Sequence, residues 1–322
     1  MALKTEYSVS IIIPVKNGGK TLNECLGSIH NQEGILLKEI IILDSGSTDN
    51  SIEIANSFGV TIIPIDPVLF NHGLTRNVGV NAAAGDLIYL TVQDAAISEK
   101  FMLERMVSHF HDPEVKAVVG IQGARQNDNA NPAIWFKRST APFVETIHFH
   151  DGSFSKLSKT DQLAVNSWDN VNAMYRKTAL VEISFKETSY CEDKIWADEA
   201  LLNDWKLLRD SSLLVYHYHH MYFSYMVSQK YIVDFFNYNR YSCLPQIPNT
   251  FMSMMKRIWG VMKKDELNLL KKSYWIYHNI IAIIAELWIT LLFRILHSAA
   301  GRNGLQWGYK QFCSKVPQGS TK

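Results

Sequence analysis

The sequence predicts an α/β fold in which a mostly parallel sheet is flanked by helices. Two observations carry this prediction. Over the first 121 residues, short apolar runs rich in Val and Ile alternate with stretches of helical character, a pattern typical of strands covered on both faces. The composition, 47% hydrophobic and 20% charged over 322 residues, is that of an ordinary globular protein.

Each predicted element follows from its local pattern. Strands are predicted over 9–15, 40–44, 60–65, 87–92 and 115–121, and helices near 20–30, 50–58, 75–84 and 99–110. Asn50 and Glu53 have the spacing of a capping box at the start of the second helix.

The pattern loosens after residue 121. From 122 to 166 the sequence is polar and rich in Asn and Ser, which predicts a functional loop or a lid. Regular structure is predicted to resume over 168–175, with a helix over 193–208 and a strand over 213–218.

The stretch IIIPVKNGGKT over 11–21 could suggest a phosphate-binding loop. A P-loop has a glycine five residues before its Gly-Lys-Thr, and here that position is Pro14. Proline has no N–H to donate and a fixed φ, so this loop cannot cradle phosphates. The dinucleotide-binding pattern also fails, because no third glycine follows the glycine pair at the required spacing. The stretch is instead a strand ending in a polar turn, where open α/β sheets bind ligands, and Lys20 and Thr21 begin the next helix.

Acidic side chains follow two other predicted strands. Asp44 ends the second strand, and a carboxylate there can accept hydrogen bonds from a nucleobase or a ribose. The alternative is a turn that caps the next helix. Gln93 and Asp94 follow the strand over 87–92. Asp94 is well placed for a hard divalent cation, which takes oxygen ligands and bridges to phosphates; a surface aspartate is the alternative.

Charge and hydrophobicity change near residue 249. Residues 250–322 contain 11 Lys and Arg against three acidic residues, although the net charge of the whole chain is +1. Apolar residues recur at helical spacing over 251–262 with basic residues between them, which predicts an amphipathic helix on an anionic membrane surface. A helix packed on its own domain is the alternative.

A second apolar run follows over 280–296. It contains Glu286 and Arg294, and its length barely spans the ~30 Å of bilayer hydrocarbon. We therefore predict an α/β domain over 1–249, which the resemblance described below makes the catalytic domain, and a basic helical tail over 250–322 that associates with a membrane.

The cysteines and the N-terminus indicate the compartment. The four cysteines are scattered and include no CxxC pair, so neither a disulfide framework nor a zinc site is expected. The opening MALKTEYSVSIIIP lacks the apolar stretch of a signal peptide. We expect a cytoplasmic protein, peripheral on the inner face of the cell membrane, with no nucleic-acid partner.

Four stretches occur in order along the first two thirds of the chain: SIIIPVKN, IILDSGSTDNS, TRNVGVNAAAGDLIYLTVQDA and CEDKIWA. As a set they resemble the family-2 glycosyltransferases, which are inverting enzymes of the GT-A fold that use nucleotide-sugar donors. The forms NHGLTRN and QDA, with WDNVNAMYRK before the Glu-Asp pair and HYH after it, are most similar to the bacterial rhamnosyltransferase branch. The resemblance implies a donor-binding part over about 1–121 and an acceptor and catalytic part over about 122–249.

The resemblance also implies a donor site. Its residues would be Pro14, Asn17, Asp44, Arg76, Gln93 and Asp94. Asp44 would hold the base and ribose, Arg76 would contact the nucleotide, and Asp94 would face a metal-bound diphosphate. The sequence departs from the family's D-x-D motif, because Val92 stands in the place of its first aspartate.

Histidines offer a partial substitute for that aspartate. His217 and His219 alternate in LLVYHYH and are expected on the same face of a strand, and imidazole is a fair ligand for Mn²⁺ and a poorer one for Mg²⁺. The resemblance to GT-A enzymes, in which a late histidine often completes the metal shell, implies that His219 or His217 joins Asp94 as a ligand. The alternatives are diphosphate contacts or structural histidines.

Displacement at an anomeric carbon requires a base that takes the proton of the acceptor hydroxyl. The resemblance assigns this role to Asp193, in the Glu-Asp pair at the start of a predicted helix. The structural alternative is that the helix dipole favours acids in this first turn. Candidate residues on the acceptor side are Glu192, Trp168, Asn170 and Asn172.

The implied function is transfer of L-rhamnose from dTDP-L-rhamnose to a glycan or polyprenyl-linked acceptor in the synthesis of a bacterial surface polysaccharide such as O-antigen. The alternatives are a family-2 transferase with another nucleotide-sugar donor, a sugar nucleotidyltransferase on a similar sheet, and a non-catalytic relative that binds glycan. A homo-oligomer is also compatible with the sequence.

Overall fold

The computed structural model describes residues 7–127, 129–135 and 141–313. By their contacts the residues form two compact units: the first contains 7–123 and 141–217, and the second contains the segment after Gly123 together with 218–313. The division after His217 precedes the predicted boundary at 249, because helix α9 (Phe223–Tyr241) packs on the long C-terminal helix α11 (Leu269–Phe312).

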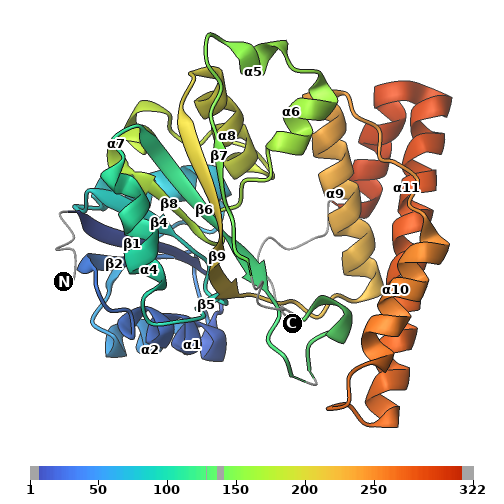
Figure 1. Ribbon diagram of the computed structural model, residues 1–322, viewed down its shortest axis with the longest axis horizontal. Helices are drawn as coiled ribbons and strands as arrows, with labels where there is room; N and C mark the ends of the chain where they lie inside the picture. The colour runs from blue at the N-terminus through green and yellow to red at the C-terminus, as the bar shows by residue number, and fades with distance from the viewer. Residues whose placement is uncertain (1–6, 128, 136–140, 314–322) are drawn as a thin grey trace. The chain divides into compact units, whose positions relative to one another are not determined.

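The first unit is built on one sheet in which the strand order is β3-β2-β1-β4-β8-β6-β9-β5 and β7 pairs with β9 (Figure 1). The strands are β1 Ser8–Val15, β2 Leu36–Asp44, β3 Thr61–Pro64, β4 Leu87–Leu90, β5 Ala96–Ile97, β6 Val115–Gly123, β7 Val144–Ile147, β8 Ala173–Arg176 and β9 Lys206–Tyr216. Strands β1 to β4 pair in parallel, as does β6 with β9. Strand β8 is antiparallel to β4 and β6, and β5 and β7 are antiparallel to β9. The α/β prediction is confirmed, with mixed strand directions in the second half.

Helices cover both faces of this sheet. They are α1 Gly19–His30, α2 Ser51–Ser57, α3 His72–Ala82, α4 Met102–Ser108, α5 Ser153–Lys156, α6 Lys159–Val165, α7 Lys177–Glu182 and α8 Glu192–Leu202. Successive side chains of β1 enter opposite cores: Ile11 packs in a cluster with Leu22 of α1, and Ile12 packs in another with Trp196 of α8. This two-sided burial is the reason that β1 is continuously apolar.

The predicted capping of α2 and the predicted start of α3 are wrong. Asn50 precedes α2 but its side chain makes no capping hydrogen bond, and the carboxylate of Asp49 accepts the N–H of Ser51 instead (3.0 Å). Helix α3 begins at His72, one turn earlier than predicted, because the side chain of Asn71 accepts the N–H groups of the next turn.

The prediction after residue 121 also changes. Helix α8 ends at Leu202, earlier than the predicted residue 208. Just after this end, Asp204 has a positive φ of 56°. Strand β9 then begins at Lys206 and ends at Tyr216, whereas a strand over 213–218 was expected. Within 122–166, the expected loop contains β7, α5 and α6.

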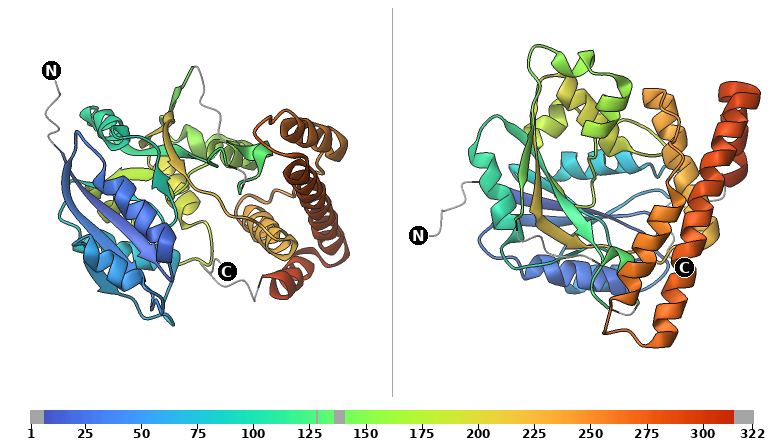
Figure 2. Two further views of the ribbon diagram at one scale, coloured as in Figure 1. Left: turned by 90° about the horizontal axis from the view of Figure 1, so that it is seen from below. Right: turned by 45° about the vertical axis from the view of Figure 1, so that its right-hand side comes forward.

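The second unit is helical. Its elements are the short turn η2 (Pro132–Ile134), α9, α10 (Thr250–Met262) and α11 (Leu269–Phe312). Helices α10 and α11 lie side by side (Figure 2). The side-chain amides of Asn131 and Asn279 exchange two hydrogen bonds of 3.0 Å, which attach the segment around η2 to α11.

Helix α11 bends at Ala300 and Gly301 and folds back. Its last turns pack so closely on α9 that a Cβ at Gly308 would overlap the Tyr231 hydroxyl. Within the described residues, α11 is the one helix that has the length and apolar composition needed to cross a membrane. One side of it is nevertheless buried against α9, through Ile289 and Phe293.

Candidate active site

The loops after β1 and β2 are joined by Asn17. Its Oδ1 accepts the N–H of Thr48 (2.8 Å), and its own N–H donates to the Ser47 hydroxyl (2.9 Å). Asp44, at the end of β2, is buried, and its carboxylate accepts the N–H groups of Gly46 (3.1 Å) and Ser47 (3.2 Å). Asp44 therefore shapes the loop at the carboxyl edge of the sheet, where a donor contact is predicted for it.

Gln93 ties the loop after β1 to the end of β4. Its Oε1 accepts the N–H of Lys16 (2.8 Å), and its Nε2 donates to the Lys16 carbonyl (3.1 Å). A Cβ at Gly18 would lie 3.1 Å from that Oε1. Pro14, in β1, is half-buried and pairs with Leu43. Gln93 thus positions the loop, and a direct donor contact from Gln93 or Pro14 stays a prediction.

Strand pairing brings Asp94 to the predicted histidines. Strands β5 and β9 are antiparallel, with Ala96 opposite Tyr216. Asp94, two residues before Ala96, therefore lies beside the end of β9. Asp94 Oδ1 lies 3.4 Å from His217 Nε2. One ligand atom each from Asp94, His217 and His219 lies within 4.8 Å of the others.

These three side chains fit a divalent cation. The strand ends at Tyr216, so both histidines lie in the irregular segment just after β9 and not within the strand as predicted. One carboxylate and two imidazoles form a donor set that suits Mn²⁺ better than Mg²⁺.

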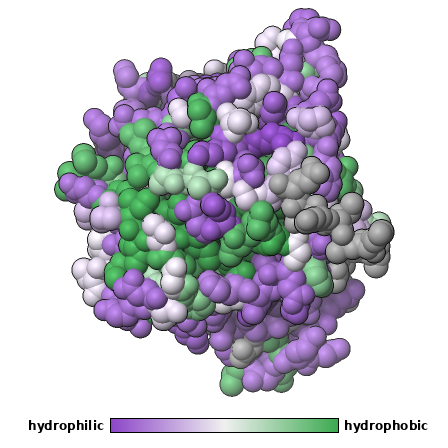
Figure 3. Space-filling model, turned by 90° about the vertical axis from the view of Figure 1, so that its left-hand side faces the viewer, coloured by the Kyte–Doolittle hydropathy of each residue, from purple (hydrophilic) through white to green (hydrophobic). Residues whose placement is uncertain are grey.

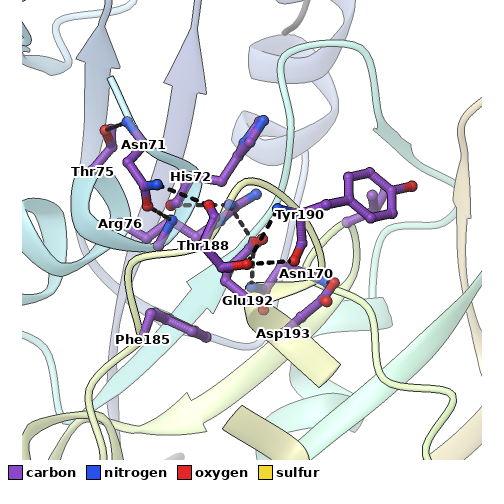
Figure 4. A network of polar contacts seen from close by, with 12 residues as sticks. Asn71, His72, Thr75, Arg76, Asn170, Phe185, Thr188, Tyr190, Glu192 and Asp193 are labelled. Atoms are coloured by element: carbon purple, nitrogen blue, oxygen red, sulfur yellow. Dashed lines mark hydrogen bonds and ion pairs between the residues drawn. The ribbon is translucent and has the colours of Figure 1, made fainter. Parts of the chain in front are cut away.

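Arg76 and Glu192 form a buried ion pair (Figure 4). Arg76 Nη1 lies 2.6 Å from Glu192 Oε1 and also donates to the His72 carbonyl (3.2 Å). Arg76 Nε is buried and has no hydrogen-bond partner among the residues that the structure describes. Gly73 makes this approach possible, since a Cβ there would lie 2.4 Å from the Lys186 carbonyl oxygen. The nucleotide contact predicted for Arg76 stays a prediction, because its charge is directed to Glu192 here.

Asn170 contacts both acids of the Glu-Asp pair. Its Nδ2 donates to Glu192 Oε1 (3.2 Å), its backbone N–H donates to Asp193 Oδ2 (3.3 Å), and its Oδ1 accepts the Tyr175 hydroxyl (2.5 Å). Figure 4 shows the Glu192 carboxylate turned toward Arg76 and that of Asp193 turned away from it. The two neighbouring acids therefore face different surroundings.

The two acids consequently have opposite pKa shifts. Burial, followed by the nearby charges of Glu192 and Asp169, raises the pKa of Asp193 to about 8. Burial alone would also raise the pKa of Glu192, but the charges of Arg76 and His72 outweigh it and hold that pKa below its ordinary value. An acid that titrates near neutral pH beside one that stays ionised is a pattern of acid–base sites.

Trp168 and Asn172 have internal partners. Trp168 Nε1 donates to the Tyr175 hydroxyl (2.7 Å). Asn172 accepts the Tyr89 hydroxyl (3.0 Å) and donates to the Leu213 carbonyl (2.9 Å). Both side chains are buried. They support the sheet around Asn170, and an acceptor contact from either side chain stays a prediction.

Sequence reasoning did not identify Gln122 and Asp169. Gln122 Oε1 lies 2.6 Å from His217 Nδ1, and Gln122 Nε2 donates to Asp169. Gln122 was assigned to an irregular loop, and only its place at the end of β6 beside β9 brings it to the histidine.

Known proteins provide an independent comparison. Residues 10–183 match the model described as glycosyl transferase family 2. The chain is 27% identical over 283 residues to the O-antigen chain rhamnosyltransferase RfbN of Salmonella typhimurium, covering 86% of this chain and 87% of the relative. It is 28% identical over 284 residues to the O-antigen chain rhamnosyltransferase WbaN of Salmonella anatum, covering 87% of each.

Solved structures have the same fold. The mannosyltransferase PcManGT of Pyrobaculum calidifontis, in complex with GDP-Man and Mn²⁺, has a TM-score of 0.52 and 13% identity, covering 95% of this chain and 79% of that chain. TarS 1–349 of S. aureus, in complex with UDP-GlcNAc, has a TM-score of 0.51 and 15% identity, covering 95% and 92%.

Proposed function

Because the chain belongs to glycosyltransferase family 2 and has the GT-A fold, we propose that it is an inverting enzyme that transfers L-rhamnose from dTDP-L-rhamnose. The acceptor is a glycan or a polyprenyl-linked saccharide of a bacterial surface polysaccharide. The choice of sugar is supported by the two rhamnosyltransferase relatives that match most of the chain. Another nucleotide-sugar donor and a non-catalytic binding role are the competing functions.

The environment of Asp193 carries the proposal of catalysis. Its carboxylate is buried, is oriented by the backbone N–H of Asn170, and has a pKa raised to about 8. Structural acids on a helix N-terminus ordinarily have lowered pKa values, because the dipole favours their charged form. A raised pKa at this position supports a group that exchanges a proton during the reaction.

In the proposed reaction, ionised Asp193 takes the proton of the acceptor hydroxyl. The acceptor oxygen forms a bond to the anomeric carbon of the donor, while the bond from that carbon to the diphosphate oxygen breaks. The electron pair leaves with dTDP, and the anomeric configuration inverts. Glu192 stays ionised through its pair with Arg76, so it does not compete for the acceptor proton.

The leaving diphosphate requires positive charge nearby. Asp94, His217 and His219 would hold a divalent cation, which would supply that charge when bound. Asp44 would hold the base and ribose of the donor, and the backbone around Asn17, on a loop that hydrogen bonds join to the loop of Asp44, would form a wall of the pocket. Mn²⁺ suits this donor set better than Mg²⁺.

A donor screen tests the function. Full-length protein is incubated with Mn²⁺ and dTDP-rhamnose, UDP-GlcNAc, GDP-mannose or dTDP-glucose, with and without lipid-linked acceptor, and nucleotide release is measured. We expect release from dTDP-rhamnose to exceed release from the other donors and to increase with acceptor. Preference for another donor would leave a transferase of different specificity, whereas binding without release from any donor would favour the non-catalytic role.

We also propose that α10 attaches the enzyme to an anionic membrane surface. One stripe of α10 leaves large apolar side chains exposed: Phe251, Met255, Trp259 and Met262, with exposed fractions of 64%, 47%, 62% and 47%. Their spacing of four, four and three residues places them on one side of the helix. A different side of the helix supplies Val261 to a buried cluster.

Basic residues accompany this stripe. In α10, the segment after it and the first turn of α11, the basic residues are Lys256, Arg257, Lys263, Lys264, Lys271 and Lys272. The Lys263 amine lies 4.7 Å from the centre of the Trp259 ring. An exposed apolar stripe with Trp and flanking lysines is typical of a helix that lies in the interface of an anionic bilayer. Attachment from the cytoplasmic side would bring the enzyme to a polyprenyl-linked acceptor.

A homo-oligomer stays a further proposal. Figure 3 shows a face on which apolar residues gather within a polar surround. Exposed apolar patches often mark interaction sites, and light scattering of the full-length protein would establish its oligomeric state.

A further inference from the structure

Gln122 makes two hydrogen bonds in opposite directions. Its Oε1 lies 2.6 Å from Nδ1 of His217, and its Nε2 donates to a carboxylate oxygen of Asp169. Gln122 lies near the end of β6, where parallel pairing places it opposite Val215 of β9. The register of the sheet therefore brings the amide of Gln122 beside His217.

The carboxylate determines the direction of this chain of hydrogen bonds. Burial raises the pKa of Asp169, while the N–H of Val171, which donates to its Oδ1 (2.8 Å), favours the ionised form. In that ionised form the carboxylate only accepts hydrogen bonds. Gln122 must then turn its NH₂ group to Asp169 and its carbonyl to His217. A carbonyl oxygen also only accepts, so the proton of neutral His217 lies on Nδ1.

The other nitrogen of this ring faces Asp94. With the proton on Nδ1, Nε2 presents a lone pair 3.4 Å from Asp94 Oδ1. A lone pair and a carboxylate oxygen repel each other at this distance unless a cation binds both. A tautomer with the proton on Nε2 would instead donate to Asp94 and would occupy the position that a cation requires.

We propose that Gln122, held by Asp169, is a positioning residue that keeps His217 in the Nδ1–H tautomer. This proposal rests on the divalent cation site of the proposed function. Nε2 of His217 is thereby kept ready as a metal ligand beside Asp94. Gln122 contacts the imidazole and acts through it. Side chains that orient a ligating histidine in this way typically change metal affinity by about 10- to 100-fold.

The tautomer is the first test, and it needs neither metal nor sugar donor. Long-range ¹H–¹⁵N correlation spectra of histidine-labelled, metal-free full-length protein report the tautomer of each ring, and the signal lost in His217→Asn identifies His217. We expect the Nδ1–H pattern in the wild type. Gln122→Met keeps the side-chain length but removes the carbonyl, and it should shift His217 toward the Nε2–H form. An Nε2–H pattern in the wild type, or a pattern that Gln122→Met leaves unchanged, overturns the proposal.

Metal affinity is the second test, measured as Mn²⁺ binding by electron paramagnetic resonance in the presence of dTDP. We expect Gln122→Met to weaken binding by about 10- to 100-fold. Gln122→Glu keeps an acceptor for Nδ1–H and should remain closer to the wild type. Gln306→Met, an exposed substitution on α11, should change nothing.

The two Gln122 variants separate positioning from packing. A packing role predicts the reverse order, because Gln122→Glu adds a like charge beside Asp169. That order, or a wild type that binds no Mn²⁺, overturns the proposal. Preference for a sugar other than rhamnose would change neither measurement, so failure of the proposed donor is distinguishable from failure of this inference.

Discussion

The guanidinium of Arg76 donates to the carboxylate of Glu192 across 2.6 Å, although 116 residues separate the two in the chain. Both side chains are buried, with exposed fractions of 5% and 8%. The pair joins the first turns of α3 to the first turn of α8, and it keeps one acid of the Glu-Asp pair ionised beside Asp193.

Removing one partner of this pair should destabilise the protein more than removing both. Arg76→Met leaves the Glu192 carboxylate buried without a counter-charge, which typically costs about 3–5 kcal/mol in the free energy of unfolding. The double variant Arg76→Met/Glu192→Leu should lose less stability than Arg76→Met alone, as measured by urea denaturation. Lys100→Met is the matched control, because the Lys100–Glu33 pair is more than half exposed and should contribute less than about 1 kcal/mol. Additive losses at Arg76 and Glu192 would contradict a coupled pair.

Asp193→Asn should abolish most sugar transfer while donor binding survives. The amide keeps the size of the side chain but cannot take the acceptor proton, and loss of a general base typically lowers the rate by about 10²- to 10⁴-fold. Turnover and the Kd for dTDP measure the two effects separately. Glu192→Gln should lower turnover less, since its carboxylate is turned toward Arg76 (Figure 4). Near wild-type turnover in Asp193→Asn with an inactive Glu192→Gln would transfer the base role to Glu192.

The pH dependence should follow the raised pKa of Asp193. Below about 8 the group is mostly protonated, so kcat/KM should rise with pH and level off above that value. The folded state keeps a proton that the unfolded state loses above the ordinary value of 3.8. This group's contribution to stability is therefore complete below about pH 4 and is lost as the pH rises to about 8.

The stability part is measured as Tm across this pH range in the wild type and in Asp193→Asn. The difference between their Tm values should grow in favour of Asp193→Asn as the pH rises. A constant difference would mean that Asp193 has an ordinary pKa.

Asp44→Asn should weaken dTDP binding. One amide oxygen can still accept the N–H groups of Gly46 and Ser47, so the loop is retained while the charge is lost. Hydrogen bonds to a charged group contribute about 1.5–3 kcal/mol, which corresponds to a Kd increase of about 10- to 150-fold by calorimetry. Asp66→Asn is the control, because this exposed aspartate also accepts a loop N–H but lies in the loop after β3. Equal affinities for wild type and Asp44→Asn would exclude a donor contact.

The exposed stripe of α10 should determine membrane binding. Truncation at residue 249 is unsuitable as a test, because Val261 and Trp275 belong to a buried cluster with Trp135. Met255→Ser/Trp259→Ser in the full-length protein should reduce co-sedimentation with anionic vesicles. High salt should also reduce it, since each Lys or Arg near the surface contributes about 1 kcal/mol. Trp307→Ser on α11, which is also exposed, should change little. If full-length protein ignores anionic vesicles at low salt, the stripe has another partner.

Local patterns in the sequence determined the parallel half of the sheet. They also determined the edge at which a ligand is expected, the carboxyl ends of these strands. Strands β1, β2 and β4 are short apolar runs whose burial on both faces leaves a clear signal, and Asp44 and Asp94 follow such runs directly. Motif resemblance identified the family, because those residues stand in order at strand ends.

The tertiary structure alone decided which distant residues meet. The partner of Arg76 depends on how α3 packs beside α8, and the meeting of Asp94 with His217 depends on antiparallel pairing of β5 with β9. Gln122 looked like part of a loop because polar residues surround it, yet hydrogen bonding to β9 extends β6 to Gly123. Likewise, the helical unit begins after His217 because α9 buries its apolar side on α11. The periodicity of apolar residues in the sequence indicates which side chains are buried. Which helix or strand covers them depends on packing between distant segments, and no local sequence pattern predicts that packing.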